Sequence, residues 1–342
     1  MKRVTGVLSS AVVTALLLAG TVVAPSSAEP VGAASACTPA TNIEAIVDDS
    51  GSMSASDSNK LRVQALSLLI GTLAPKTTLG TVEFGSAFLG GVAAETIFLP
   101  EAVGPNATAM RSALKQKIQA DNGATDYNAA FAKSDADNPN ANARIFLTDG
   151  GHNEGDYSEA HLPHNVPTYV VGFGTGLTAP EDQGRLEKIA NDSGGKYFLL
   201  SDASQLQSVM NSIGAALTCQ TPPRQFTDQL AQGQSKPHGV AVGASTKSLQ
   251  IALTWANPLD TFAIAGVKLV SGRKLLAVAA RPGTKRKPAK LKIVREASPT
   301  FVVLKVSNLR KGRLVFNVKA TKVGSGEPKA TLTTQVGQIS RK

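Results

Sequence analysis

The chain has 342 residues, 42% of them hydrophobic and 18% charged, with a formal net charge of +10. This length and apolar content suffice for one large or two medium folded domains and exclude a low-complexity chain. Lys and Arg number 11 against 20 Asp and Glu over residues 37–219, but 22 against 4 over residues 220–342. These counts give about −9 and +18, which predicts two domains of opposite charge.

An export signal is predicted at the start of the chain. Lys2 and Arg3 precede the apolar run VLSSAVVTALLLAGTVVA, and small residues allow cleavage by a signal peptidase after Ala28 or Ala36. We take residues 1–28 as the signal peptide and expect a secreted, extracellular protein or one associated with the cell surface. An uncleaved membrane anchor is the alternative, which the glycine and proline in this region disfavour. No later segment is apolar enough over a sufficient length to predict a membrane span.

Two cysteines, Cys37 and Cys219, bracket the acidic part of the chain. Two cysteines in an exported protein usually pair. Their bond would close a loop of roughly 180 residues, for which the chain-entropy model gives a stabilisation on the order of 5 kcal/mol as an upper figure. Lipid modification of Cys37 is the alternative, but no Leu stands three residues before it. We therefore predict a disulfide bond.

Residues 41–218 alternate between strand-like and helix-like segments. This alternation predicts an α/β fold with a doubly wound, mostly parallel sheet and helices on both faces. In this architecture, sites form where loops leave the carboxyl ends of the strands. Strands are predicted over residues 42–48, 78–86, 92–99, 143–149, 167–174 and 195–201, and helices over residues 60–73, 107–120, 126–136, 181–194 and 204–217.

Oxygen-bearing side chains follow three of these predicted elements. Asp48, Ser50 and Ser52 stand at the end of the first strand, Thr125 lies in the loop NGATDYNAA, and Asp149 closes the strand IFLTD. In a doubly wound sheet these loops converge on one edge. Hydroxyl and carboxylate oxygens without Cys or His suit a hard cation such as Mg²⁺. The sequence therefore predicts a metal site at this edge.

The stretches DDSGS, GATD and LTDG resemble the metal-ion-dependent adhesion site of the von Willebrand factor type A domain, which reads Asp-x-Ser-x-Ser, then Thr, then Asp. The resemblance continues through TYVVGFG and LEKIANDSGGKYFLLSDASQL and covers residues 41–218; Ala124 stands where the family often has Gly. It implies that the serines, and in some states the Thr, bind the metal directly, whereas the aspartates act largely through water. The metal would be Mg²⁺, with Mn²⁺ or Ca²⁺ as alternatives.

The resemblance also implies a function. The sixth coordination position would bind an Asp or Glu of a protein partner, so the expected protein is a binding or adhesion protein and not an enzyme. A metal-dependent hydrolase is the first alternative, because an open metal position can activate water, but no general base is identifiable. A wall-associated structural protein anchored by its basic domain is the second. His152, His161 and His164 could form a transition-metal site, although we expect them to be surface residues near the metal site.

The domain organisation follows from the change in pattern after Cys219. We expect the type A domain over residues 37–219, a stiff linker with two prolines over residues 220–236, and a basic β-sandwich over residues 237–342. In this last part helical periodicity disappears, and seven or eight short alternating segments separated by turns predict an antiparallel sandwich. The pattern weakly resembles the β-sandwich accessory modules of secreted bacterial proteins.

The densest positive charge lies in the stretch RPGTKRKPAKLKIVR. It is either a solvated strand face with a basic hairpin or a surface for polyanions such as an anionic cell-surface polymer. Nucleic acid is not expected, since no aromatic residues interleave with the charges and the protein is exported. The candidate polyanion-binding residues are Arg281, Lys285, Arg286, Lys287, Lys290, Lys292 and Arg295.

Overall fold

The computed structural model describes residues 37–85, 92–119, 123–159, 162, 165–177, 179–271, 274–279, 289–324 and 326–340. The predicted signal peptide lies outside these residues. Thr38–Lys342 form one compact unit. No helix in the described part of the chain has the length and hydropathy required to cross a membrane.

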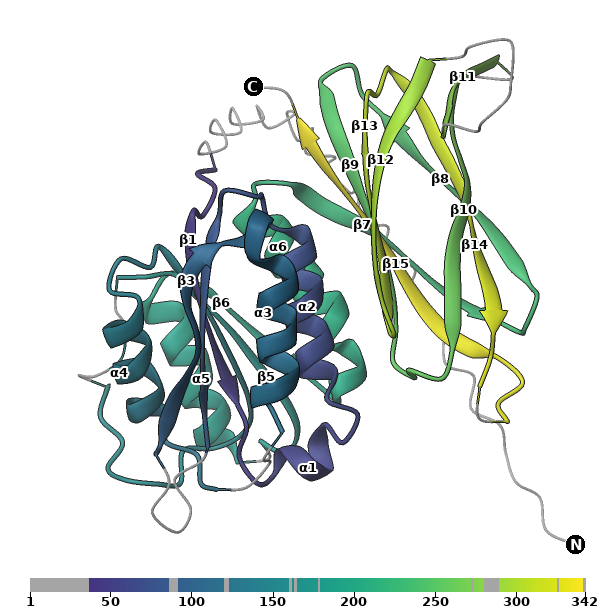
Figure 1. Ribbon diagram of the computed structural model, residues 1–342. Helices are drawn as coiled ribbons and strands as arrows, with labels where there is room; N and C mark the ends of the chain where they lie inside the picture. Colours follow the sequence, from purple (N-terminus) through teal and green to yellow (C-terminus); the bar gives the residue numbers. More distant parts are fainter. Residues whose placement is uncertain are drawn as a thin grey trace, which may run out of the picture. The chain divides into compact units, whose positions relative to one another are not determined.

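A six-stranded sheet occupies the centre of the first half of this unit, in the order β3-β2-β1-β4-β5-β6 (Figure 1). All neighbours pair in parallel except β3, which runs antiparallel to β2. The predicted doubly wound, mostly parallel sheet is thus confirmed. Its strands are β1 (Asn42–Asp48), β2 (Thr78–Phe84), β3 (Ala94–Ala102), β4 (Ala143–Gly150), β5 (Thr168–Gly176) and β6 (Lys196–Leu200).

Helices cover both faces of this sheet because its central strands are apolar on both sides. On β1, Ile43, Ala45 and Val47 pack in the core with α2, α3 and α6, whereas Ile46 packs in the core with α4 and α5. Period-two alternation places these side chains on opposite faces. The helices are α1 (Met53–Ser56), α2 (Leu61–Thr72), α3 (Val103–Lys117), α4 (Tyr127–Asp137), α5 (Pro180–Asp192) and α6 (Leu206–Leu217), the last preceded by the 3₁₀ turn η3 (Ala203–Gln205).

Helix α3 begins four residues earlier than the predicted helix over residues 107–120. The segment Val103–Gly104–Pro105 suggests a break, but Pro105 lies in the first turn, where a missing N–H costs no helical hydrogen bond. The N–H groups of Val103 and Gly104 donate instead to the carbonyls of Thr77 (2.9 Å) and Pro75 (2.8 Å). These contacts connect the start of α3 to the loop before β2.

The second half of the unit is the predicted β-sandwich, with nine strands in place of the seven or eight expected. The strand order is β7-β15-β9-β13-β12-β11-β10-β14-β8. All neighbouring strands pair antiparallel except β11 and β12, which pair in parallel. Strands from β7 to β12 and strands from β11 to β8 in this order both contribute side chains to one apolar core. The strands are β7 (Thr221–Leu230), β8 (Ser235–Val242), β9 (Thr246–Trp255), β10 (Thr261–Ser271), β11 (Lys274–Ala279), β12 (Ala289–Ser298), β13 (Phe301–Ser307), β14 (Gly312–Lys322) and β15 (Ala330–Ser340).

Residues 220–236 do not form the stiff linker that the sequence predicts. Residues 221–230 form β7, an edge strand that pairs antiparallel with β15. The Pro222–Pro223 pair is compatible with this position, because an edge strand has one side without ladder hydrogen bonds. The boundary between the two domains is therefore marked by a strand and not by an extended spacer.

The two cysteines are disulfide-bonded, as predicted. Near this bond, the N–H of Ala40 donates to the carbonyl of Leu217 at 2.9 Å, which connects the segment before β1 to the last turn of α6. The ends of the first domain are therefore connected both covalently and by hydrogen bonding.

One face of the β7–β12 half of the sandwich packs against α2 and α6. Leu68 of α2 forms a buried cluster with Ala252, Phe301 and Val303. Beside it, Asn211 of α6 donates from Nδ2 to Oε1 of Gln335 at 2.9 Å, and both side chains are buried. This half of the sandwich is therefore covered on both faces.

Candidate metal centre

The loop that follows β1 and the loop that precedes α4 meet the end of β4 at the carboxyl edge of the parallel sheet. The N–H of Gly51 donates to the carbonyl of Gly123 at 3.1 Å, which holds the first loop against the second. The N–H of Asp49 donates to the carbonyl of Phe84 at 2.7 Å, so the first loop also follows the end of β2. The topology thus brings together the three stretches that the sequence singled out.

Asp48 is fully buried at the end of β1. Its Oδ1 accepts the N–H of Ser50 at 2.8 Å, and its Oδ2 accepts the hydroxyl of Thr148 at 2.6 Å. Burial, and after it the nearby charge of Asp149, raise the pKa of Asp48 to about 7 against the opposing hydrogen bonds from Ser50 and Thr148. Without a cation, this site therefore disfavours two ionised carboxylates.

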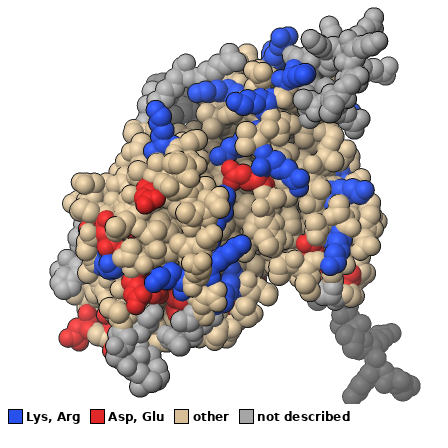
Figure 2. Space-filling view, in the orientation of Figure 1, with Lys and Arg blue, Asp and Glu red and all other residues tan. Residues whose placement is uncertain are grey.

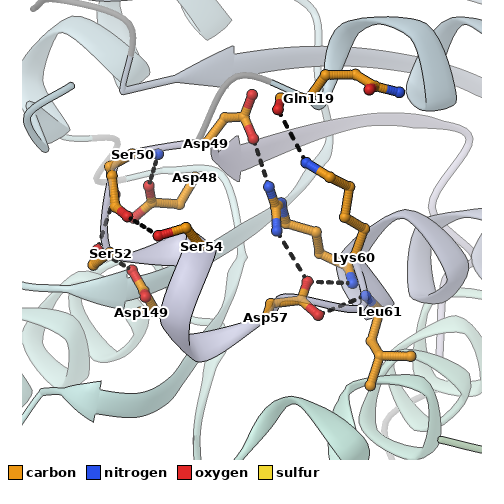
Figure 3. Close-up of polar contacts among 12 residues, drawn as sticks. Asp48, Asp49, Ser50, Ser52, Ser54, Asp57, Lys60, Leu61, Gln119 and Asp149 are labelled. Carbon is orange, nitrogen blue, oxygen red and sulfur yellow. Dashed lines mark hydrogen bonds and ion pairs between the residues drawn. The ribbon is translucent and has the colours of Figure 1, made fainter. Parts of the chain in front are cut away.

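The hydroxyl of Ser52 points toward Asp149, and the hydroxyl of Ser50 lies beside that of Ser52 (Figure 3). Ser52 Oγ donates to Asp149 Oδ1 at 2.7 Å and lies 3.2 Å from Ser50 Oγ. The Oδ2 atom of Asp149 is buried and has no hydrogen-bond partner among the described residues. Burial raises the pKa of Asp149, opposed by the hydroxyls of Ser56 and Ser52 and by the charge of Arg62. Ser52 itself is exposed, so the site reaches solvent there.

Thr125 supplies the hydroxyl from the second loop, and it is buried. Its N–H donates to Oδ1 of Asn153 at 2.7 Å, and the N–H of Asn153 donates back to the carbonyl of Thr125 at 2.9 Å. A Cβ added to Gly150 would lie 3.6 Å from Ser52 Oγ and 3.8 Å from Thr125 Oγ1. The hydroxyls of the two loops therefore lie on the same side of the end of β4. Asn153 escaped the sequence analysis because a single Asn in a loop carries no motif.

A buried ion-pair triad supports the first loop (Figure 3). Arg62 of α2 donates from Nη2 to Asp49 Oδ1 at 2.6 Å and from Nη1 to Asp57 Oδ2 at 3.1 Å. Asp57 also accepts the backbone N–H groups of Leu61 (2.6 Å) and Arg62 (2.9 Å), and so stabilises the start of α2. Strand alternation points Asp49 away from the candidate ligands, and its pairing with Arg62 is consistent with that direction.

Gly85 allows the first loop to approach β2 closely. It has φ +121, and an added Cβ would lie 2.4 Å from the backbone nitrogen of Ser50. Only glycine readily combines this conformation with such an approach. On the α4 side, the buried rings of Phe84, Tyr127 and Phe146 contact one another, and Tyr127 Oη donates to the carbonyl of Gly150 at 2.5 Å. Rigid packing therefore surrounds the polar atoms.

His152 is not the surface residue that we expected. Its side chain is 4% exposed, and its Nδ1 accepts the N–H of Tyr127 at 3.1 Å. Nε2, 3.2 Å from the carbonyl of Gly155, is then the protonated nitrogen that donates. Because both ring nitrogens are engaged, His152 has no lone pair left for a metal. His161 and His164 lie outside the described residues.

The donor set fits a hard divalent cation. It consists of two buried carboxylates and hydroxyl oxygens, with no sulfur or imidazole, which is the chemistry that Mg²⁺, Mn²⁺ or Ca²⁺ prefers. The unpartnered Oδ2 of Asp149 and the raised pKa of Asp48 both indicate negative charge that lacks compensation. Arg62 compensates this charge only in part, since Asp49 and Asp57 pair with it directly.

The fold and this arrangement of oxygens define a von Willebrand factor type A module. The model of that family matches residues 42–212, so the chain belongs to the von Willebrand factor type A domain family. A search of the curated proteins gave no match.

Several solved structures are similar in fold. One, described as von Willebrand factor type A from Catenulispora acidiphila, is 18% identical with a TM-score of 0.41, over 88% of this chain and 66% of that one. The pilus adhesin SpaC from Lactobacillus rhamnosus GG is 12% identical with a TM-score of 0.42, over 87% of this chain and 43% of that one. Proximal thread matrix protein 1 from the mussel byssus, described with a zinc-occupied MIDAS motif, is 17% identical with a TM-score of 0.42, over 57% and 50%. The chain thus spans less than two thirds of the length of each of these structures.

The basic stretch of the second domain is only partly described. Arg281, Lys285, Arg286 and Lys287 lie outside the described residues. The remaining candidates, Lys290, Lys292 and Arg295, are exposed on β12.

Proposed function

We propose that this chain is a secreted or cell-surface binding protein that recognises a carboxylate of a protein partner through a divalent cation. The cation would be held by Asp48, Ser50, Ser52, Thr125 and Asp149. Membership of the type A family supports a binding role in general terms. The metal and the partner chemistry are our proposal, and the role is non-enzymatic.

The observation that carries the proposal is the buried Oδ2 of Asp149, which has no hydrogen-bond partner in the described part of the chain. A buried carboxylate oxygen without a donor is costly, and a cation would satisfy it. The hydroxyl of Ser52 already donates its proton to Asp149 Oδ1, so the lone pairs of its oxygen remain for a metal. When bound, the cation would supply a positive charge that neutralises both aspartates and attracts an external carboxylate.

The protein contributes orientation and access. Thr148, Asn153 and the Arg62 triad fix the backbone and the carboxylates without using the oxygens assigned to the metal, except for the bond from Thr148 to Asp48. Exposed Ser52 leaves the site open on one side. A partner side chain can therefore approach from solvent, whereas the buried side stays closed.

A binding assay on the full chain tests this function. An array of peptides that present Asp or Glu, each with a matched Asn or Gln version, is probed with Mg²⁺ or with chelator. We expect binding only to carboxylate peptides and only with metal. Thr125→Ala should weaken it at least tenfold, whereas Ser54→Ala, which loses an exposed hydroxyl bonded to Gly51, should not. Equal binding with chelator would contradict the proposal, as would metal-dependent hydrolysis of peptides or phosphoesters.

A further inference from the structure

The outer side of four strands in the sandwich carries positive charge and no acidic residue. Strands β8, β10, β11 and β14 contain no Asp or Glu. On β14 the side chains alternate: Leu314, Phe316 and Val318 are fully buried in the core, whereas Arg313, Asn317 and Lys319 are exposed. Figure 2 shows basic side chains on the visible surface of the sandwich, with a few acidic ones near its lower end.

Strand register aligns the outward residues into one surface. Lys268 of β10 pairs with Val315 of β14, between Arg313 and Asn317 on the same face. We call Lys268, Arg313, Asn317 and Lys319 the basic face. Arg313 and Lys319 are six positions apart on β14, so they lie roughly 20 Å apart at 3.3 Å per residue. Among the described residues, no carboxylate forms an ion pair with Lys268, Arg313 or Lys319.

Small residues flank this row of long side chains. Across the sheet, most outward neighbours of β14 on β8 and β10 are small, and Val270 lies opposite Arg313. The small neighbours are Ser235, Pro237, Gly239, Ala241, Ala263 and Ala265. At Gly239 the close approach is specific: an added Cβ would lie 2.5 Å from Nε of Arg313. The guanidinium therefore lies over β8 in space that any other residue would fill. The long cationic side chains are therefore flanked mainly by small ones.

The acidic residues of this domain are placed elsewhere. Asp228 is buried and pairs with Lys236 and His238, and Glu296 pairs with Arg111 of α3. Asp260 is buried and accepts the N–H of Gly324 at 2.7 Å. None of these three carboxylates belongs to the strands of the basic face. The fourth acidic residue of the domain, Glu327, is exposed in the loop after β14, and among the described residues it forms no ion pair with Lys268, Arg313 or Lys319.

We infer that the basic face binds a linear phosphate polymer along β14. Phosphate fits because guanidinium and ammonium groups bind it by charge-assisted hydrogen bonds, and the row of cations matches a chain with repeated charges. Base stacking would need aromatic residues, and the members and flanking residues of the basic face include none. The same composition offers no aromatic wedge for insertion into a lipid surface. This inference concerns a second binding activity, independent of the metal.

The test measures binding of long-chain inorganic polyphosphate to the full chain in chelator, across a salt series. The test variant is Lys268→Gln/Arg313→Gln/Lys319→Gln. The comparison variant is Lys290→Gln/Lys292→Gln/Arg295→Gln on β12, which removes the same charge from the described part of the basic stretch that the sequence singled out as a candidate polyanion surface, so this control tests the rival location. We expect the test variant to lose at least tenfold in affinity at low salt and to reduce the slope of log affinity against log salt by about 2, because fewer counterions are released. The control should lose less than threefold.

An equal or larger loss in the β12 control would overturn the inference, since it would place binding elsewhere or on net charge alone. Tighter binding to phosphatidylglycerol vesicles than to polyphosphate would also overturn the inference if the test variant lost vesicle affinity to the same extent. That result would show that the basic face binds a lipid surface. Chelator is present throughout, so a failure of the metal-dependent function leaves this result unaffected. Conversely, loss of polyphosphate binding would leave metal-dependent carboxylate binding intact.

Discussion

Arg62 Nη2 lies 2.6 Å from Asp49 Oδ1, and the two side chains are 0% and 1% exposed. The pair joins α2 to the loop that carries Ser50 and Ser52. The positions of these two hydroxyls therefore depend on the buried ion pair between Arg62 and Asp49. Asp57 completes the triad from the other side of the guanidinium. A buried pair of this kind is costly to break, because the remaining partners keep their charge without compensation.

Arg62→Met should therefore destabilise the protein by about 3 to 5 kcal/mol, since Asp49 and Asp57 would remain buried and unpaired. Arg62→Met/Asp49→Asn/Asp57→Asn should recover a large part of this loss, because no unpaired charge remains. Urea unfolding of the full chain measures both. A loss below 1 kcal/mol in Arg62→Met would show that the triad does not stabilise the loop.

Asp149→Asn should abolish measurable binding of Mg²⁺ and Mn²⁺ while the folded state persists, because it removes negative charge but keeps the shape of the side chain. Titration calorimetry detects the loss, and circular dichroism checks the fold. Ser54→Ala, which removes an exposed hydroxyl of α1, serves as the control. Retention of full metal affinity in Asp149→Asn would place the metal elsewhere.

The stability of the metal-free protein should fall as pH rises. Asp48 has a folded pKa of about 7 against an ordinary value of 3.8, so between these values the folded state holds a proton that the unfolded state has lost. The free energy of unfolding therefore decreases across this window and is lowest above it. Burial is the main cause that raises the pKa of Glu44 to about 8. Glu44 therefore also lowers the free energy of unfolding as pH rises, and its effect extends to a higher pH than that of Asp48.

Melting temperatures at pH 5, 6, 7 and 8, with chelator and with Mg²⁺, measure this effect. Mg²⁺ should remove the part due to Asp48, and so should Asp48→Asn, whereas the part due to Glu44 should remain in both. A metal-free melting temperature that rises between pH 5 and 7 would contradict the assignment.

Gly85→Ala should reduce both stability and metal affinity, because φ +121 and the contact with the nitrogen of Ser50 exclude a Cβ. The matched control is Gly184→Ala in α5, where an added Cβ meets nothing within 4 Å. That substitution should stabilise the protein by about 0.5 to 1 kcal/mol, since alanine favours the helix. Thermal melts and Mn²⁺ titration of both variants test the difference, and equal behaviour would remove the proposed role of Gly85.

Cys37→Ser/Cys219→Ser should lower the free energy of unfolding by at most about 5 kcal/mol, because the bond closes most of the first domain into one loop. Denaturant unfolding compares this variant with the oxidised protein. The oxidised protein treated with reductant should behave like the double variant. A difference below 1 kcal/mol would show that the bond hardly restricts the unfolded chain.

The elements of the first domain were predictable because each depends on its own pattern of buried positions. The bounds of β1 agree with the predicted strand over residues 42–48, since every side chain from Ile43 to Asp48 is buried. The candidate ligands were predictable for a related reason: they follow strands whose carboxyl ends must share one edge in a parallel sheet. The loops around Thr125 and Asp149 thus meet without any signal in the residues between them.

The sequence by itself determined the fold class, the charge division and the candidate oxygens, because composition, periodicity and strand order depend on local or summed properties. Only the tertiary structure decided which partners distant groups would choose. It paired Arg62 with Asp49, 13 positions away, buried His152 between Tyr127 and Gly155, and used residues 221–230 as a strand where a linker was expected. The physical reason is the same in each case: a hydrogen bond, an ion pair or an edge strand forms with whatever group packing brings near, and a single segment does not encode that group.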